Sequence, residues 1–316
     1  RIHGYENIPE DVIVPMAPSH KSDRDRVMDK IRGALTSVGC DEAVSLSGVS
    51  EEASELFSPW NDQPSLRVSC PIIKGADRLR KSLVPSLLQV RRDNEKSGNE
   101  IIELFETAKI YLPRNGKLPD EPWMLGVCGG GDFFEVKGII ETVLAELNPH
   151  AELEAVPTSH DLLDSEKSAE LRLDGKTLGY LGEVSESELA QFGLRKSATV
   201  AELRLDVLEQ AAVLVPQHQP QSKRPTIDRQ LNFVVGEGVR WSDLAACAKE
   251  KAGKFLEDLR YVETYRGKGV GEGKKSLLME LVFRGQETNL TNEEVNVDCD
   301  RIAQAVQQTL GGELRE

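Results

Sequence analysis

Hydrophobic residues recur every three or four positions in three parts of the chain, a spacing that places side chains on one face of an α-helix. The pattern predicts helices at 27–38, 79–90 and 136–147, and Gly39 follows the first as a suitable terminating residue. Pro85 fits the second helix only at its start or at a kink. The third segment has the clearest apolar face and predicts an amphipathic helix packed on a core.

Segments typical of β-strands alternate with these helices. Residues 42–46 and 101–112 predict strands, and 171–180 predict a hairpin whose turn is formed by Asp174 and Gly175. Helices and strands mixed in this order indicate an α+β fold with a largely antiparallel sheet.

The last part of the chain predicts a complete set of elements. We expect a strand at 231–235, a helix at 241–256, strands at 261–265 and 276–283, a helix at 292–310 and a short strand near Leu314. The order β-α-β-β-α-β is that of the ferredoxin-like fold. Because this fold hosts many functions, it does not identify one by itself.

Two irregular stretches with three prolines each, 7–22 and 216–225, divide the chain. The second is otherwise polar, so it neither packs into a core nor sustains a helix. Since the chain starts at Arg1 within a motif, we expect it to be a piece of a longer protein. The parts we expect are a remnant of a preceding domain at 1–10, a larger module at 11–215, a linker at 216–224 and a C-terminal domain at 225–316.

The composition of the 316 residues, 39% hydrophobic and 29% charged, is typical of a soluble globular protein. No stretch approaches the roughly 20 consecutive apolar residues of a membrane helix, and no signal segment begins the chain, so we expect neither membrane insertion nor secretion. The five cysteines lie far apart and form no C-x-x-C pair. This spacing favours reduced thiols in the cytoplasm over a zinc site or a set of disulfides. The cysteines are Cys40, Cys70, Cys128, Cys247 and Cys299.

The net charge of −14 argues against a general affinity for nucleic acid, but the charge is unevenly spread. Residues 222–316 hold 15 Lys and Arg against 16 Asp and Glu, whereas the first 221 residues hold 24 against 37. An anionic partner would therefore meet the C-terminal part more readily than the rest of the chain.

The larger module offers no clear catalytic constellation. Three glycines at 129–131 lack the lysine of a phosphate-binding loop, and Asp132 after them would repel phosphate, so we expect a tight turn. The five histidines show no metal-ligand spacing, and we expect them at the surface. Asp132, Glu135 and Glu141 could form paired carboxylates, but Glu135 begins a predicted helix, where it complements the helix dipole.

The segment 266–275 is the best candidate for binding. Its four glycines allow close backbone approach, while Arg266, Lys268, Lys274 and Lys275 supply positive charge. Tyr265 at its edge offers a ring on which a base could stack. From the residues alone, both a solvated hairpin loop and an RNA contact remain open.

Several motifs occur together in the order found in one family. They are R-I-H-G-Y-E-N-I-P at 1–9, L-R-K-S-L-V-P-S-L-L at 79–88, Asn94, L-F-E at 104–106, D-F-F-E-V-K-G at 132–138, G-Y-L-G-E at 179–183, Y-R-G at 265–267, G-K-K-S-L at 273–277 and E-E-V at 293–295. This series resembles the C-terminal portion of bacterial phenylalanyl-tRNA synthetase beta subunits: a class II synthetase-like module, then a ferredoxin-fold anticodon-binding domain.

The resemblance implies that the larger module is inactive. In the family, phenylalanine and ATP are handled by the alpha subunit, and class II chemistry needs arginines at the ATP phosphates. Residues 104–106 offer no arginine at the first position, and 179–185 offer none at the second. We therefore expect no catalytic residue here, and expect helices around 79–96 and 136–147 to bury surface against the alpha subunit.

The resemblance also implies which residues of the last domain contact the tRNA anticodon. The matching positions are Asn232, Tyr265, Ser276 and Arg315, where a ring can stack on a base and polar side chains can bind base edges or phosphate. Lys274 and Lys275 would add attraction to the RNA backbone that does not depend on sequence.

The whole enzyme implied by the resemblance joins phenylalanine to tRNA-Phe with ATP and magnesium, as two alpha and two beta chains in the cytoplasm. The family's magnesium ligands and editing domains would precede Arg1, so we expect no metal site in this chain. Two alternatives remain: a stand-alone RNA-binding or regulatory paralogue without a synthetase partner, and an independent ATP-using enzyme, which the missing arginines disfavour.

Overall fold

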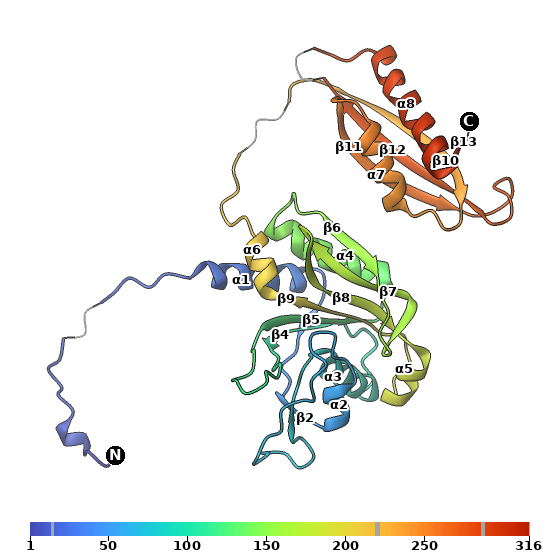
Figure 1. The fold of residues 1–316 in the computed structure, drawn as a ribbon. Helices are drawn as coiled ribbons and strands as arrows, with labels where there is room; N and C mark the ends of the chain where they lie inside the picture. The colour runs from blue at the N-terminus through green and yellow to red at the C-terminus, as the bar shows by residue number, and fades with distance from the viewer. Residues whose placement is uncertain (14–15, 219–221, 286–287, 316) are drawn as a thin grey trace. The chain divides into compact units, whose positions relative to one another are not determined.

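The computed structural model describes residues 1–13, 16–218, 222–285 and 288–315, and these fall into two compact units (Figure 1). Unit 1 is Arg1–Pro216 and unit 2 is Gln217–Glu316. The division lies inside the stretch of prolines at 216–225, and residues 219–221 of the expected linker are outside the described residues.

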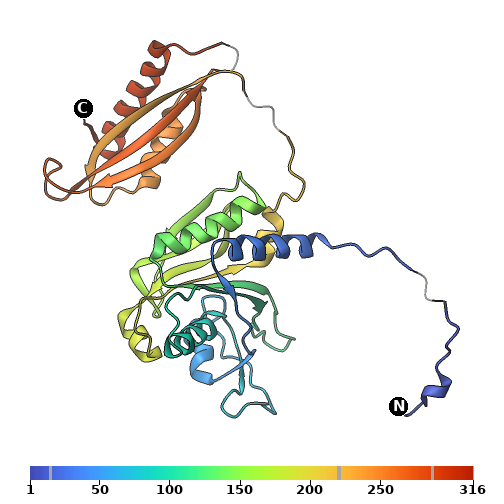
Figure 2. The ribbon, with the colours of Figure 1, turned by 180° about the vertical axis from the view of Figure 1, so that it is seen from behind.

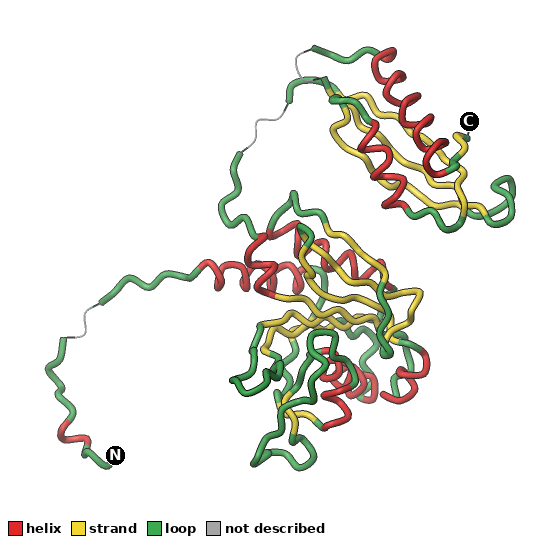
Figure 3. Tube along the Cα trace, viewed as in Figure 1, coloured by secondary structure: helices red, strands yellow, loops and turns green. Residues whose placement is uncertain are grey.

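Unit 1 mixes helices and strands along its length (Figure 3). Its elements are η1 (Tyr5–Asn7), α1 (Asp23–Ser37), β1 (Asp41–Glu42), β2 (Gly48–Val49), α2 (Glu51–Glu55), β3 (Arg78–Leu79), α3 (Val84–Lys96), β4 (Leu104–Lys109), β5 (Trp123–Gly129), α4 (Phe133–Leu147), β6 (Leu153–Pro157), β7 (Leu163–Leu173), β8 (Lys176–Val184), α5 (Glu186–Phe192), β9 (Thr199–Arg204) and α6 (Leu205–Ala211).

Seven strands of unit 1 form one sheet in the order β1-β4-β5-β9-β8-β7-β6, and within the described residues only the short β1–β4 pair is parallel. Apolar side chains cover both of its faces. One core includes α1, α4 and α6, and α1 lies beside α4 over the sheet (Figure 2). The other core includes α3, and Leu189 and Phe192 of α5 pack at its margin. Both faces of this sheet are therefore buried in hydrophobic cores, which stabilise the fold.

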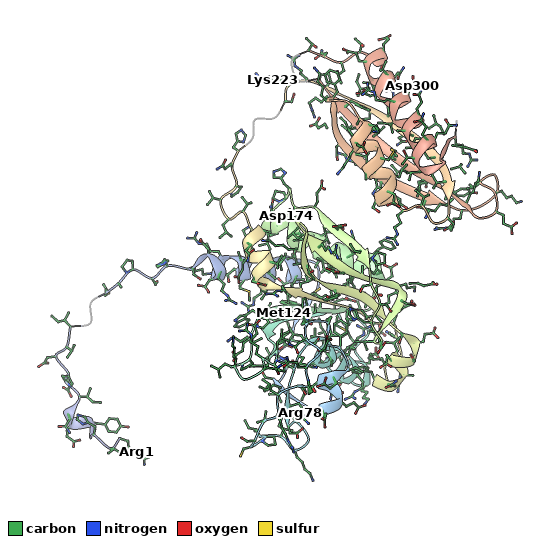
Figure 4. All side chains as sticks on the ribbon, viewed as in Figure 1. Arg1, Arg78, Met124, Asp174, Lys223 and Asp300 are labelled. Atoms are coloured by element: carbon green, nitrogen blue, oxygen red, sulfur yellow. The ribbon has the colours of Figure 1, made fainter. Side chains whose placement is uncertain are left out.

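Local chemistry explains several boundaries in unit 1. Asp132 caps α4 in a reciprocal capping box with Glu135, so the negative charge that follows the three glycines is used to begin a helix. Asp174 and Gly175 both have positive φ, 50° and 74°, as expected for the tight turn between β7 and β8. Asp174 lies at the surface of the unit, whereas Met124 of β5 is buried inside it (Figure 4).

Some predicted boundaries in unit 1 were wrong. Leu79 belongs to β3, and the helix predicted from 79 begins only at Val84, because Pro85 occupies its first turn. The strand expected at 42–46 is reduced to β1, and the one expected at 101–112 narrows to β4. The remaining residues of the predicted strands have side chains typical of strands, but their backbones are not paired continuously with a neighbouring strand.

Unit 2 contains β10 (Thr226–Gly236), α7 (Trp241–Lys251), β11 (Leu256–Tyr265), β12 (Lys274–Arg284), α8 (Asn292–Leu310) and β13 (Glu313–Leu314). The sheet order is β11-β12-β10-β13, and α7 and α8 pack together against one face of it (Figure 1). The predicted α+β fold class and β-α-β-β-α-β order are confirmed. The helix expected to reach 256 ends at Lys251, since Leu256 already starts β11.

No helix among the described residues has the length and apolar character needed to cross a membrane. The five cysteines are free thiols; Cys70 is exposed and the other four are buried. In the described part of the chain, no three His, Cys, Asp or Glu side chains are grouped as metal ligands.

Candidate nucleic-acid interface

One face of the unit 2 sheet is left uncovered by helices. The core under α7 and α8 takes alternate residues of the long strands, including Phe233 and Val235 of β10 and Leu277 and Met279 of β12. Because successive side chains of a strand point to opposite faces, the residues between them lie on the other, open face.

The strand register shows which residues lie side by side on this open face. Ser276 is paired with both Val234 and Tyr265, and Leu278 is paired with both Asn232 and Glu263. Cross-strand partners share a face of the sheet, so these two rows are neighbours. The structure therefore brings Asn232, Tyr265 and Ser276 to the same end of the open face.

The last residues of the chain complete this end of the face. The amide of Arg315 donates to the carbonyl of Asn232 at 2.8 Å, next to the β13 pairing of Leu314 with Phe233. The Arg315 side chain is exposed and extends toward the glycine-rich loop: a Cβ built on Gly269 would lie 3.3 Å from a guanidinium nitrogen.

We define the loop end as Asn232, Tyr265, Ser276 and Arg315 together with the loop 266–273. Tyr265 is 45% exposed, enough of a ring for a base to stack on. Ser276 is only 2% exposed, and its hydroxyl donates to the side-chain oxygen of Asn232. Ser276 therefore fixes the orientation of the Asn232 side-chain amide through its oxygen.

The two lysines expected to attract RNA lie on different faces. Lys274 is paired with Gly236 on the open face and is exposed, 3.9 Å from a carboxylate oxygen of Glu313. Lys275 is paired with Val235, which belongs to the core, so it lies on the helix-covered side. Of the six predicted residues, the structure brings five together and separates Lys275 from them.

The far end of the same face has the opposite character. Asp228 and Asp258 are both paired with Val282, and Glu280 is paired with Arg260 in the next row. Arg260 contacts both Asp258, at 2.7 Å, and Glu280, at 3.5 Å. Carboxylates at this end disfavour a phosphate group there, although Arg260 partly neutralises them.

The glycine-rich loop is folded rather than solvated along its whole length. Gly269, Gly271 and Gly273 have φ of +94°, +89° and +73°, a region that side chains other than glycine rarely adopt. Val270 at its centre is only 4% exposed, and its amide donates to the carbonyl of Gly267. The loop is thus a fixed part of the surface beside Tyr265.

Unit 1 contains a buried polar layer that was not predicted from the sequence. Arg80 and Glu106 form an ion pair of 3.1 Å with both side chains 4% exposed, and Ser45 hydrogen-bonds to each of them. Glu202 of β9 is fully buried and accepts from the indole of Trp60 at 2.6 Å and the amide of Leu83 at 2.5 Å. Arg80 lies in the motif at 79–88 and Glu106 in the motif at 104–106, and these motifs are the feature of the sequence that could have pointed to the pair.

Burial raises the pKa of the Glu202 carboxyl to about 7, against the hydrogen bonds from Leu83, Trp60 and Ser82 and the nearby charge of Arg80. Its oxygens and those of Glu106 are engaged in internal contacts, which hold the segment before α3 against the sheet. A cluster with these partners stabilises the fold.

Two further predictions from the sequence of unit 1 concern His160 and the three glycines at 129–131. His160 was expected at the surface and is instead half-buried, with its ring edge-on to Phe57 and Tyr180; burial lowers its pKa. The three glycines at 129–131 lead from β5 into α4 through a short bend, where the amide of Gly130 donates to Glu103 at 2.9 Å. This agrees with a structural role for the glycines.

Comparisons with known proteins match both units. The model of the phenylalanyl tRNA synthetase beta chain CLM domain matches residues 8–205, and that of the ferredoxin-fold anticodon binding domain matches 222–315. The phenylalanine–tRNA ligase beta subunit of Rhodopirellula baltica is 39% identical over 325 residues, which cover 97% of this chain and 48% of that protein. That of Clostridium tetani is 29% identical over 323 residues, covering 100% and 41%.

Among solved structures, pyrrolysyl-tRNA synthetase from Desulfitobacterium hafniense aligns over 58% of this chain and 67% of its own, with a TM-score of 0.48 and 16% identity. That likeness is too distant to support a further statement. The chain spans about half the length of the curated relatives it matches, or less.

The fold and the two family models define the class: a phenylalanyl tRNA synthetase beta chain module of α+β fold followed by a ferredoxin-fold anticodon-binding domain. The first model alone matches well over half of the chain. The chain belongs to the phenylalanyl-tRNA synthetase beta chain family, which confirms the resemblance predicted from its motifs.

Proposed function

We propose that this chain is the part of a phenylalanine–tRNA ligase beta subunit that contacts the tRNA anticodon and docks the alpha subunit, without supplying a catalytic residue. The observation that carries the proposal is the loop end, where residues far apart in sequence, such as Asn232, Tyr265 and Arg315, meet on an uncovered sheet face.

The chemistry of the loop end suits an unpaired stretch of RNA. The exposed ring of Tyr265 stacks on a base, and base–aromatic stacking contributes about 1–3 kcal/mol. The Asn232 amide, oriented by Ser276, donates to a base edge. Arg315 and Lys274 bind phosphate. Lys275, on the other face, adds only general attraction.

The surface of unit 1 supports the docking part of the proposal. The apolar side chains of α3 and α4 that were expected to meet the alpha subunit are mostly buried within unit 1 itself. A groove of about 330 Å³ beside β2 and β3 is lined instead by exposed apolar residues, including Leu46, Ile72 and Ile73. An exposed apolar patch is typical of a protein interface, and the family's alpha subunit is the partner we propose for it.

The remaining features belong to the whole enzyme. It would charge tRNA-Phe with phenylalanine at the expense of ATP, with magnesium, as two alpha and two beta chains in the cytoplasm. We assign none of the described residues to magnesium or ATP. Three buried charged groups are engaged internally: Arg80 with Glu106 and Ser45, and Glu202 with Trp60 and Leu83.

Phenylalanine-dependent exchange of pyrophosphate into ATP tests this proposal. We expect no exchange from this chain or from the alpha subunit alone, and exchange when alpha is combined with the beta subunit containing this chain. Exchange by this chain alone would show an active site that the proposal denies. A chain that binds RNA but never activates or binds alpha would be a stand-alone RNA-binding paralogue.

A further inference from the structure

The glycine-rich loop beside the proposed anticodon site is attached to the rest of unit 2 at both of its ends by one residue, Glu237. Its carboxylate accepts from two nitrogens of Arg266, at 2.9 Å and 2.6 Å. Its amide donates to the carbonyl of Gly273 at 3.0 Å. Residues 266 and 273 are the first and last of the loop, so Glu237 closes it.

The contacts of the loop reach the residues proposed to bind RNA. The Tyr265 hydroxyl lies against Gly267, where a built Cβ would be 2.6 Å away, and Arg315 lies against Gly269. Val270 is buried and holds the centre of the loop in place. A change in the position of this loop would therefore move both the aromatic ring and the guanidinium.

We infer that Glu237 and Arg266 are positioning residues for anticodon binding: their ion pair fixes the loop 266–273 and, through it, Tyr265 and Arg315. This inference rests on the proposed function. The pair also accounts for the lowered pKa of Glu237 and the raised pKa of Arg266, since each side chain's hydrogen bond to the other is the largest influence on both.

The sign of one substitution separates positioning from simple electrostatics. Glu237→Gln removes a negative charge beside Arg266 and Lys275 at this end of unit 2, so electrostatics alone predicts tighter binding of an anionic RNA. If Glu237 positions the loop, the same substitution weakens binding. Both side chains of the pair are about half exposed, so the fold itself should depend little on the pair.

The test uses the full-length beta subunit assembled with alpha, and measures the affinity for tRNA-Phe, phenylalanine activation without tRNA, and thermal unfolding. We expect Glu237→Gln to weaken tRNA binding about threefold to fivefold, the range that the loss of an exposed ion pair allows. Arg266→Glu should weaken it at least as much, because it also adds negative charge beside the RNA. The double variant Glu237→Arg with Arg266→Glu should recover affinity to within about twofold, because it restores the pair with its charges exchanged.

The matched control is Glu272→Gln, which neutralises another carboxylate of the loop and leaves the Glu237 contacts intact. It should leave binding unchanged or slightly tighter. Tighter or unchanged binding by Glu237→Gln, in an enzyme that Tyr265→Ala does weaken, would overturn the positioning role and leave the proposed function standing. If Tyr265→Ala also had no effect on tRNA affinity, the proposed function and this inference would both fall.

Discussion

The two units use antiparallel sheets in opposite ways. The seven-stranded sheet of unit 1 is covered on both faces, and its charged residues, among them Arg80, Glu106 and Glu202, are buried with internal partners. The four-stranded sheet of unit 2 is covered on one face only, and Tyr265 and Arg315 stay exposed on or beside the other. The comparison separates polar groups that are buried with internal partners from polar groups that stay exposed on an uncovered sheet face.

The two units differ in how many hydrogen-bonding groups of their polar side chains remain without an internal partner. The Glu202 oxygens accept from Trp60 and Leu83, so they have little capacity for a substrate. Asn232 is held by Ser276 through its oxygen and keeps its amide nitrogen for another partner. Similar chemical groups thus serve stability in one unit and, in the function we propose, recognition in the other.

The largest effect that we expect comes from Glu202→Ala. It leaves the Trp60 indole and the Leu83 amide buried without an acceptor and creates a cavity, so the free energy of unfolding should fall by about 3 kcal/mol or more. Urea unfolding followed by circular dichroism measures this. Glu170→Ala on β7, which removes the surface pair with Arg172, should cost much less. Equal losses of unfolding free energy in the two variants would mean that the buried polar layer stabilises the fold no more than a surface ion pair does.

The same variant gives a pH test. Glu202 has a pKa of about 7 in the folded chain and an ordinary value near 4.5 when unfolded. Between these values the folded state keeps a proton that the unfolded state has released, so this group's contribution to stability falls as pH rises through the window. The stability difference between wild type and Glu202→Ala should therefore shrink by about 2–3 kcal/mol from pH 5 to pH 8. A constant difference would refute the raised pKa.

Tyr265→Ala tests the exposed face. Loss of stacking should weaken tRNA-Phe binding by roughly 1–3 kcal/mol, about fivefold to over a hundredfold, while activation of phenylalanine without tRNA stays unchanged. Tyr261→Ala is the matched control: Tyr261 is on the same strand and equally exposed, but is paired with Met279 on the helix-covered side. Its loss should affect RNA binding little. A fall in activation equal to the fall in binding would contradict the assignment.

Gly269→Ala should have a smaller effect. The residue has a φ of +94°, and its new Cβ would press on the Arg315 guanidinium, so we expect tRNA binding to weaken by about 1 kcal/mol, roughly fivefold. Gly238→Ala is the control, because that glycine has ordinary φ and open space around it. If both glycine variants bound tRNA equally well, the loop would not need its present shape.

Lys274→Gln should give the smallest change. Removing one exposed cation that we propose contacts phosphate should reduce the salt dependence of binding, with the slope of log affinity against log salt falling by about 1. Lys275→Gln, on the opposite face, should leave the slope nearly unchanged. Titrations at several salt concentrations compare the two. Equal slopes for both variants would show that the sheet face does not matter.

The sequence predicted unit 2 better than unit 1. In unit 2 the strands alternate apolar and polar residues because one face is open, and glycines with positive φ separate β11 from β12. The helix at 292–310 was predicted at its observed ends from its apolar face, and the structure shows a capping box of Thr291 with Glu294 at its start and a glycine after Leu310. Period-two alternation and caps are local signals that a single sequence contains.

In unit 1 the central strands β5 and β9 were not predicted, although they lie at the middle of the sheet. Both are buried on two sides, so they lack the alternation that marks a half-exposed strand. The contacts of Glu202 with Trp60 and Leu83 span more than a hundred residues. Such partnerships arise from the tertiary fold and cannot be found from spacing. The motif resemblance supplied the candidate site, and the register showed that Lys275 faces away from it.

The most direct test of the central claim is a double-mutant cycle between Tyr265 and the anticodon. The affinity of the assembled enzyme is measured for tRNA-Phe with its own anticodon and with the anticodon bases replaced, for the wild-type chain and for Tyr265→Ala. Contact between the two predicts coupling: replacing the anticodon should weaken the wild type strongly and Tyr265→Ala much less. If the anticodon change weakened binding equally for both enzymes, the losses would be additive. That result would contradict the claim that the loop end of unit 2 binds the anticodon.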